Sequence, residues 1–377
     1  MKIVLAPDSF KESMTAHQAV EAMERGVRAV VPDAHCVGVP MADGGEGTTA
    51  ALVAATGGEL VAADVHDPLG RPVRARYGFV PAQALAIVEV AAAVGIDLVA
   101  PADRDPLRAS SAGLGELVRD ALDRGARRLV VGLGGSVTND GGAGMMQALG
   151  ASLRDAGGAE LPPGAGPLAR LATLDLSGLD PRVRELTVEI ASDVTNPLLG
   201  PQGASAVFGP QKGATPDAVP LLDGALGVWA AAIARATGRD VAARPGAGAA
   251  GGLGAAFLAF FESTMARGVD VVMRAARLED RMTGADLVLT GEGCVDAQTV
   301  RGKTPFGVAQ AASRHGVPVI AFAGRIGEGA EVLYDYGFAA LVPIVRSVTD
   351  LPTALADGPA NLQAAVETVF RVLTLRR

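Results

Sequence analysis

A chain of 377 residues with a net charge of −8 is long enough for two domains, each with its own hydrophobic core. The acidic balance and the lack of a basic tract in the sequence exclude nucleic acid and anionic membranes as expected partners. Two cysteines, Cys36 and Cys294, are too few for a disulfide framework and are typical of a reducing cytosol. We therefore expect a cytoplasmic protein.

The first residues, MKIVLAPDSF, have the pattern of a short strand rather than of a signal peptide. A helix is predicted from about Thr15, because apolar residues then recur at helical spacing. A second strand at Cys36–Met41 ends in a glycine loop that carries Asp43 and Glu46. This βαβα order predicts a parallel sheet with ligand sites at the carboxyl ends of its strands.

The pattern then changes to strict alternation of apolar and polar residues. The segments Glu59–His66 and Arg71–Val80 flank a turn and predict an antiparallel hairpin, the entry to an inserted domain. A strand is predicted at Ala84–Val90. Ser110 or Ser111 can cap the helix that follows.

The stretch Val130–Gly144, VVGLGGSVTNDGGAG, changes from an apolar run to glycines and polar side chains before apolar residues return. That order predicts a buried strand, a tight loop and a helix. A glycine-rich turn at a helix N-terminus gathers backbone N–H groups that favour an anion, so we expect a phosphate site here. A plain strand-to-helix connection is the alternative.

Further along, the strand Thr187–Ala191 ends in a polar loop, and Phe208–Gly213 forms another. A helix is predicted over Pro216–Thr237. The segment Gly246–Gly251 matches GxGxxG but does not follow a strand, which favours close packing of a helix start over dinucleotide binding. The segment Ala297–Thr304 is one glycine short of a P-loop and lacks its preceding strand.

From Asp286 onward the first pattern returns, with three strands and two helices. They are predicted at Leu287–Leu289, Lys303–His315, Val317–Ala323, Ala339–Ile344 and from Gly358. We predict an α/β fold with two α/β domains, one a discontinuous Rossmann- or flavodoxin-like parallel-sheet domain of residues 1–65 plus 285–377. The other, residues 66–284, is an inserted mixed α/β domain, and the active site is expected in the cleft between them.

Six loops combine glycine or proline with polar or charged side chains, and most follow predicted strands. They are Asp8–Lys11, Asp43–Thr48, Gly134–Asp140, Asp193–Asn196, Gln211–Lys212 and Gly291–Lys303. Only four of the 33 basic residues are lysines, and three of the four lie in such loops. Carboxylates, lysines and glycine amides without a cluster of histidines suit phosphoryl transfer, which needs Mg²⁺ on oxygen ligands, a cation and a base.

The longest of these stretches resemble the signature segments of the type 1 glycerate kinases of bacteria. They are APDSFKES, PMADGGEGT, GLGGSVTNDGGAGMMQALG, SDVTNPLLGPQGA, FGPQKGA, GAGAAGGLGA and TGEGCVDAQT..GKTP. The resemblance covers nearly the whole chain and implies two α/β domains and ATP-dependent phosphorylation of D-glycerate to 2-phosphoglycerate. One departure is Cys294, which stands where the family's TGEGRxD pattern has Arg.

Residue roles can be hypothesised from this chemistry. We expect Asp193 as the base, Lys11 and Lys303 as catalytic cations, and Asp8, Ser9, Lys11 and Arg325 as the glycerate site. ATP phosphates are expected on Gly134, Gly135, Ser136, Thr138, Asn139 and Lys212, and Mg²⁺ on Asp43 and Glu46. As an alternative to the base role, Asp193 is a turn residue.

Other functions remain open at this point. A glycerate kinase giving 3-phosphoglycerate is one, and a nicotinamide-dependent oxidoreductase that uses the GAGAAG loop is another. A binding protein with a polar cleft would need a signal peptide, which the first residues do not resemble. We expect a small-molecule substrate and a nucleotide as ligands. An oligomer is possible but not indicated.

Overall fold

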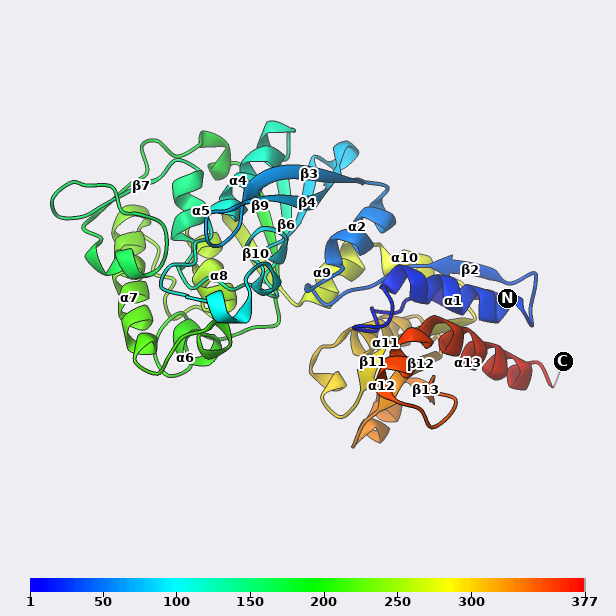
Figure 1. The fold of residues 1–377 in the computed structure, drawn as a ribbon. Coiled ribbons are helices and arrows are strands. Elements are labelled where there is room, and N and C mark those ends of the chain that lie inside the picture. The colour runs from blue at the N-terminus through cyan, green and yellow to red at the C-terminus, as the bar shows by residue number, and fades with distance from the viewer. Residues whose placement is uncertain (376–377) are drawn as a thin grey trace. The chain divides into compact units, whose positions relative to one another are not determined.

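The structure, a computed structural model, describes residues 1–375, which form two compact α/β units (Figure 1). Unit 1 is built from Met1–Asp43, Ala50–Gly57 and the chain from Val269 onward. Unit 2 is built from Gly44–Thr49 and Gly58–Gly268. Unit 1 therefore contains both ends of the described chain, and unit 2 lies between them in sequence.

Within the described residues, unit 1 has a sheet of five parallel strands in the order β13-β12-β11-β1-β2. The strands are β1 (Lys2–Leu5), β2 (His35–Gly38), β11 (Leu287–Val295), β12 (Val319–Ile326) and β13 (Phe338–Pro343). The chain adds β2 on one side of β1 and the later strands on the other. The strand order thus reverses between β1 and β11, the place where open α/β sheets bind ligands.

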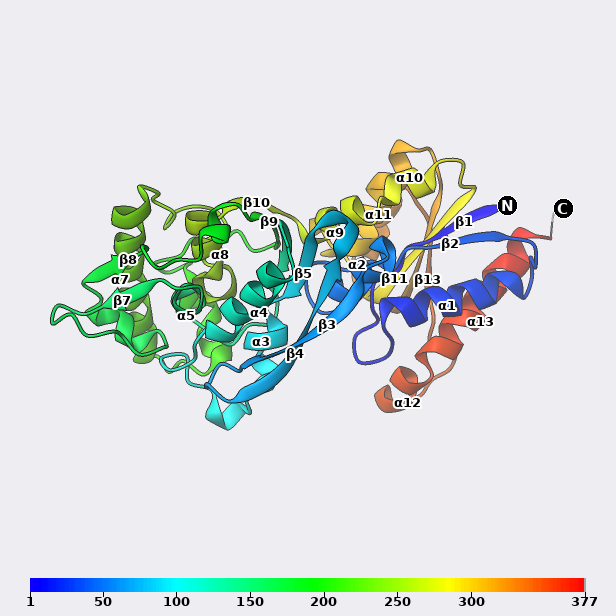
Figure 2. The ribbon, with the colours of Figure 1, turned by 90° about the horizontal axis from the view of Figure 1, so that it is seen from above.

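Helices cover both faces of this sheet, with α1 and α13 on one face and α10 and α11 on the other (Figure 2). Apolar residues of β1, β11, β12, α1 and α13 form a common core that includes Leu5, Met23, Phe322 and Phe370. The helices of unit 1 are α1 (Ala16–Arg28), α2 (Thr48–Thr56, which begins in unit 2), α9 (Gly268–Ala275), α10 (Leu278–Met282), α11 (Thr304–Arg314), α12 (Leu351–Ala356) and α13 (Gly358–Leu373).

Two strands of unit 1 are longer than the sequence predicts. Strand β11 was expected to end at Leu289 and β12 at Ala323, with loops beyond. Instead both strands continue side by side, and Cys294 pairs in register with Arg325. The glycines that indicated a turn are needed inside the strand, because a Cβ at Gly291 would clash with the backbone of Phe322 and meet the ring of Phe10.

Unit 2 has, within the described chain, a mixed sheet of six strands in the order β10-β9-β6-β5-β4-β3. Strand β4 pairs antiparallel with both β3 and β5, whereas β5, β6, β9 and β10 run parallel. The six are β3 (Glu59–His66), β4 (Pro72–Val80), β5 (Leu85–Glu89), β6 (Arg128–Gly132), β9 (Thr187–Ala191) and β10 (Glu262–Ala266), and a separate pair is β7 (Ser152–Arg154) with β8 (Thr173–Asp175). The predicted hairpin and the predicted α/β fold class are confirmed.

The helices of unit 2 enclose a core that includes Tyr77, Trp229, Phe257 and Phe261. They are α3 (Ala91–Val94), α4 (Ala112–Asp123), α5 (Ala143–Ala148), α6 (Ala204–Phe208), α7 (Ala218–Thr237) and α8 (Ala249–Phe260). By length and composition alone, α7 could cross a membrane. Its Leu222, Trp229 and Ile233 are instead fully buried in the core of unit 2.

Candidate active site

Two carboxylates of unit 1 lie where the strand order of its sheet reverses. Asp8 follows β1, and its backbone N–H donates to the carbonyl oxygen of Gly291 on β11 at 2.8 Å. Glu292 is the next residue of β11. The loop after β1 packs over this part of β11, since a Cβ at Gly293 would touch the backbone of Phe10 and Lys11. The geometry of the parallel sheet therefore brings the two acids to one place.

The carboxylate of Asp8 is buried and hydrogen-bonded. It accepts from the backbone N–H of Ser9 at 2.6 Å and from the hydroxyl of Thr304 in the first turn of α11. Burial and the charge of Asp43 raise the pKa of Asp8 to about 6, and the hydrogen bonds from Thr304 and Ser9 act in the opposite direction. Asp8 therefore titrates near neutral pH.

Glu292 is paired with a lysine. The ammonium of Lys303 lies 3.5 Å from the Glu292 carboxylate and 3.7 Å from that of Asp296, and it donates to the carbonyl of Cys294 at 3.2 Å. Burial raises the pKa of Glu292 to about 7, Lys303 opposes this shift, and the charges of Asp8 and Asp43 add to it. Carboxyls with pKa values near 7 next to a cation can take up and return a proton at neutral pH.

Sequence reasoning assigned no role to Glu292 or Thr304. The signal that could have found Glu292 is a carboxylate between two glycines at the end of a central parallel strand. The other residues predicted for this part of the site differ in exposure. Ser9 and Asp43 are partly buried, whereas Lys11 and Arg325 are exposed.

In unit 2, the predicted glycine loop follows β6 and precedes α5, as the sequence predicts. Gly134 and Gly135 are exposed, whereas Ser136, Thr138 and Asn139 are buried. A second glycine loop, Gly44–Thr49, packs directly against the end of β6 and against the first loop. A Cβ at Gly132 would clash with the Gly44 carbonyl, and one at Gly134 would press on the Cα of Gly45. Two of the six predicted loops therefore meet at the carboxyl end of β6.

Asp140, at the end of the glycine loop, fixes this loop through buried hydrogen bonds. Its fully buried carboxylate accepts from the backbone N–H and the hydroxyl of Ser111, at 2.7 and 2.8 Å, and from the backbone N–H groups of Gly142 and Gly144. Burial raises the pKa of Asp140 against these hydrogen bonds. Of the two serines predicted to cap α4, Ser111 occupies the N-cap position but its hydroxyl binds Asp140 and the backbone N–H of Met145. The hydroxyl of Ser110 instead accepts from the backbone N–H of Ala112 at 3.2 Å.

Lys212, at the end of the short 3-10 helix η6 (Pro210–Lys212), is buried beneath the same loop. Its ammonium donates to the hydroxyl of Ser136 at 3.0 Å and to the carbonyl of Thr138 at 2.7 Å. The amide of Asn139 donates to the Ser205 hydroxyl at 2.9 Å. The structure thus brings Lys212 together with two of the residues predicted to bind ATP, Ser136 and Thr138, although the lysine itself is not exposed.

The remaining predicted residues of unit 2 are on its surface. Asp193, after β9, and Glu46, in the Gly44–Thr49 loop, are both exposed. The described residues contain no group of three or more His, Cys, Asp or Glu side chains arranged to hold a metal ion. Mg²⁺ in kinases needs only one or two protein carboxylates, because substrate phosphates and water complete its shell.

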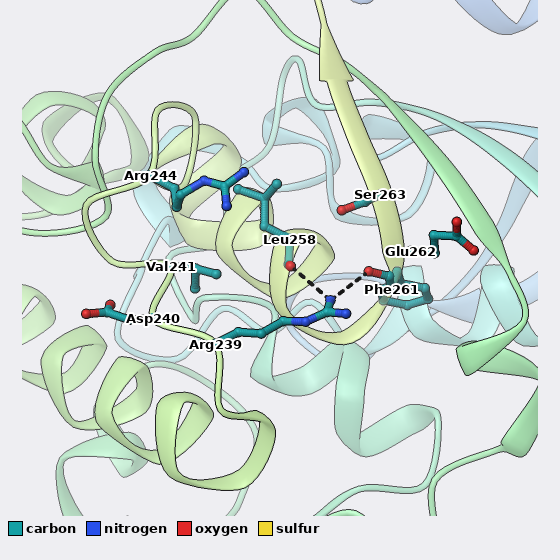
Figure 3. Close-up of a pocket in the computed structure, with 8 residues that line it drawn as sticks. All are labelled: Arg239, Asp240, Val241, Arg244, Leu258, Phe261, Glu262 and Ser263. Atoms are coloured by element: carbon teal, nitrogen blue, oxygen red, sulfur yellow. Dashed lines mark hydrogen bonds between the residues drawn. The ribbon is translucent and has the colours of Figure 1, made fainter.

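The GAGAAG segment packs closely against other backbone. A Cβ at Gly248 would clash with the carbonyl of Pro197, and one at Gly251 with the carbonyl of Thr138. Close packing is therefore the correct interpretation of these glycines. A pocket of about 400 Å³ elsewhere in unit 2 contains none of the predicted site residues, and in it Arg239 donates to the carbonyls of Leu258 and Phe261 at the end of α8 (Figure 3).

Comparison with known proteins identifies the family of the chain. The profile of the Glycerate kinase family matches residues 3–374. The chain belongs to the glycerate kinase family. A family member from Bacillus subtilis (strain 168), named glycerate kinase, is 50% identical over 377 residues, which cover 100% of this chain and 99% of the relative. Glycerate 2-kinase of Escherichia coli (strain K12) is 45% identical over 375 residues, which cover 100% and 98%.

A solved glycerate kinase structure has the same fold. The crystal structure named for glycerate kinase 2 of Salmonella typhimurium LT2 matches with a TM-score of 0.91 and 48% identity, over 99% of this chain and 98% of that one. The family resemblance predicted from the sequence motifs is therefore confirmed.

Proposed function

We propose that this glycerate kinase family member transfers the γ-phosphoryl group of ATP to the 2-hydroxyl of D-glycerate in the cytoplasm. The observation that carries the proposal is the family match over residues 3–374, with a relative named glycerate 2-kinase at 45% identity. The buried acids and the lysine of unit 1 provide the proton acceptor and the cation that this reaction needs.

Two roles follow for the centre made by Asp8, Glu292 and Lys303. As the substrate hydroxyl oxygen bonds to the γ-phosphorus and the bond to the β,γ-bridging oxygen breaks, Glu292 accepts the hydroxyl proton and ADP leaves. The ammonium of Lys303, 3.5 Å from Glu292, neutralises charge on the transferred group. The exposed cations Lys11 and Arg325 pair with the carboxylate of glycerate.

The nucleotide phosphates are assigned to the glycine loop of unit 2. Gly134 and Gly135 present exposed backbone at the end of β6, and Asp140 fixes the loop from below. Fixed backbone N–H groups stabilise phosphate oxygens without reorganising during the reaction.

The carboxylates of unit 1 fit a divalent cation. Asp43 raises the pKa of both Asp8 and Glu292, so the three acids repel one another, and a bound cation would relieve that repulsion. We assign Mg²⁺ to Asp43 together with Asp8, where it would neutralise charge on the triphosphate. Glu46 as a second ligand stays a prediction.

The test is an ADP-release assay with D-glycerate, L-glycerate and glycerol, followed by ³¹P NMR of the product. Turnover with D-glycerate and a 2-phosphoglycerate signal are expected, whereas 3-phosphoglycerate would contradict the choice of hydroxyl. Asp193 stays the alternative base. A Glu292→Gln variant should lower kcat by ~10²-fold or more, and an equal loss in Asp193→Asn with normal Glu292→Gln turnover would move the base to unit 2.

A further inference from the structure

The ammonium of Lys212 is a buried charge without a hydrogen-bonded counter-ion. Its two acceptors, the Ser136 hydroxyl and the Thr138 carbonyl, are neutral groups. The part of the chain that the structure describes supplies no ion pair and no further hydrogen bond for this ammonium. A buried charge normally has an opposite charge beside it, because removal from water is otherwise very unfavourable.

Other charged groups near Lys212 do not serve as its hydrogen-bonded counter-ion. Asp140 is already bound by four donors from Ser111, Gly142 and Gly144. Helix α6, which packs on η6, carries no titratable side chain. The segment against Gly213 contributes Arg104, which is itself a cation.

The glycine loop connects Lys212 to the outside of unit 2. Because the Ser136 oxygen accepts from Lys212, its own hydroxyl proton remains available for an acceptor, and no such acceptor is found among residues 1–375. The neighbouring Gly134 and Gly135 are exposed. An anion on these glycines can therefore accept from Ser136 while Lys212 polarises that hydroxyl from behind.

We propose that the nucleotide polyphosphate is the missing counter-ion of Lys212, acting through Ser136, and that nucleotide binding makes Lys212 take up a proton. Lys212 is then a positioning residue that does not touch the nucleotide. The inference rests on the proposed function, because it uses the assignment of ATP to the glycine loop.

The size of the effect follows from the charge state of the free protein. Burial lowers the pKa of Lys212 to about 7, and the charge of Asp140 only partly opposes this. At pH 8 the amine is then mostly neutral, so that up to about 0.9 proton enters from solvent when the anion binds. At pH 5.5 the amine is already charged, and the uptake falls to about zero.

Isothermal titration calorimetry tests this directly. The full-length enzyme is titrated with ATP in magnesium chloride, without glycerate, at pH 8 in three buffers of different ionisation enthalpy. The slope of binding heat against ionisation enthalpy gives the number of protons taken up. A Lys212→Met variant should show no uptake and a Kd for ATP raised about tenfold or more, because the Ser136 hydroxyl loses the charge that polarises it toward the phosphate.

The matched control is Lys2→Met, which removes an ammonium that donates to the carbonyl of Thr283 in unit 1. It should keep the proton uptake and the affinity of the wild type. No uptake by the wild type at pH 8 would overturn the inference even if Lys212→Met failed to fold. Unchanged uptake in Lys212→Met would also overturn it, because the proton would then belong to another group and Lys212 would be merely structural.

A failure of the proposed function gives a different result. If ³¹P NMR finds no phosphoglycerate while ATP binding still takes up a proton at Lys212, the nucleotide site is supported and the assignment of glycerate as substrate is wrong. If phosphoglycerate forms but binding takes up no proton, the inference about Lys212 alone is wrong.

Discussion

The carboxyl of Glu292 should cost the protein stability at neutral pH. Its pKa is raised from 4.5 to about 7 in the folded state. The folded protein therefore binds this proton more tightly than the unfolded chain, and stability falls as the pH rises from about 4.5 through 7. At 1.36 kcal/mol per pKa unit the loss is about 3 kcal/mol, complete at pH 8 and nearly nil at pH 4. The amide of a Glu292→Gln variant does not ionise, so this variant should regain the lost stability.

Urea denaturation of the wild type and of Glu292→Gln at pH 4 and pH 8 measures this difference. The one tryptophan, Trp229, lies in unit 2, so its fluorescence reports that unit, whereas far-UV circular dichroism reports both. The gain in the free energy of unfolding should appear in the transition of unit 1, which circular dichroism detects and the tryptophan fluorescence does not. Glu328→Gln, an exposed control in unit 1, should change neither transition. A variant that is less stable than the wild type at pH 8 would refute the reasoning.

Three further outcomes are expected. Lys303→Met removes the cation that opposes the rise in the pKa of Glu292, so the acidic limb of the kcat/KM profile should move about one unit to higher pH. Asp140→Ala leaves the four donors from Ser111, Gly142 and Gly144 unpaired and should lower the free energy of unfolding of unit 2 by about 3 kcal/mol, measured by tryptophan fluorescence in urea. Gly251→Ala places a Cβ against backbone at a φ of +67° and should cost about 2 kcal/mol or more in the same assay, whereas Gly224→Ala, with open space around it in α7, should be neutral or stabilising.

Sequence patterns predicted those helices, strands and loops whose structure depends on residues that are close in sequence. The capping box of Thr15 and Gln18 begins α1 where the apolar spacing predicts a helix. Alternation predicted the β3–β4 hairpin, and the glycine-rich change of pattern predicted the loop after β6. In each case the residues that carry the signal are close in sequence to the structure that they form.

The features that sequence reasoning missed depend on distant partners. Glycines in β11 were interpreted as a turn, but pairing with β12 and the approach of Phe10 require them within a strand. Ser111 is positioned as a helix cap, yet Asp140, far along the chain, takes its hydroxyl. The burial of Lys212 and the raised pKa of Glu292 likewise arise only when remote segments enclose them.

The position of β1 within its sheet has a consequence for protein synthesis. Strand β1 emerges from the ribosome before unit 2, but its neighbour β11 is translated only after the whole of unit 2. Unit 2 can fold during translation, because its long segment, Gly58–Gly268, is continuous in sequence. During that time β1 and β2 are paired with each other but lack the remaining strands of their sheet. A fragment that stops before β11 therefore exposes one edge of β1, the strand that precedes Asp8, and this edge is paired only when β11 has been translated.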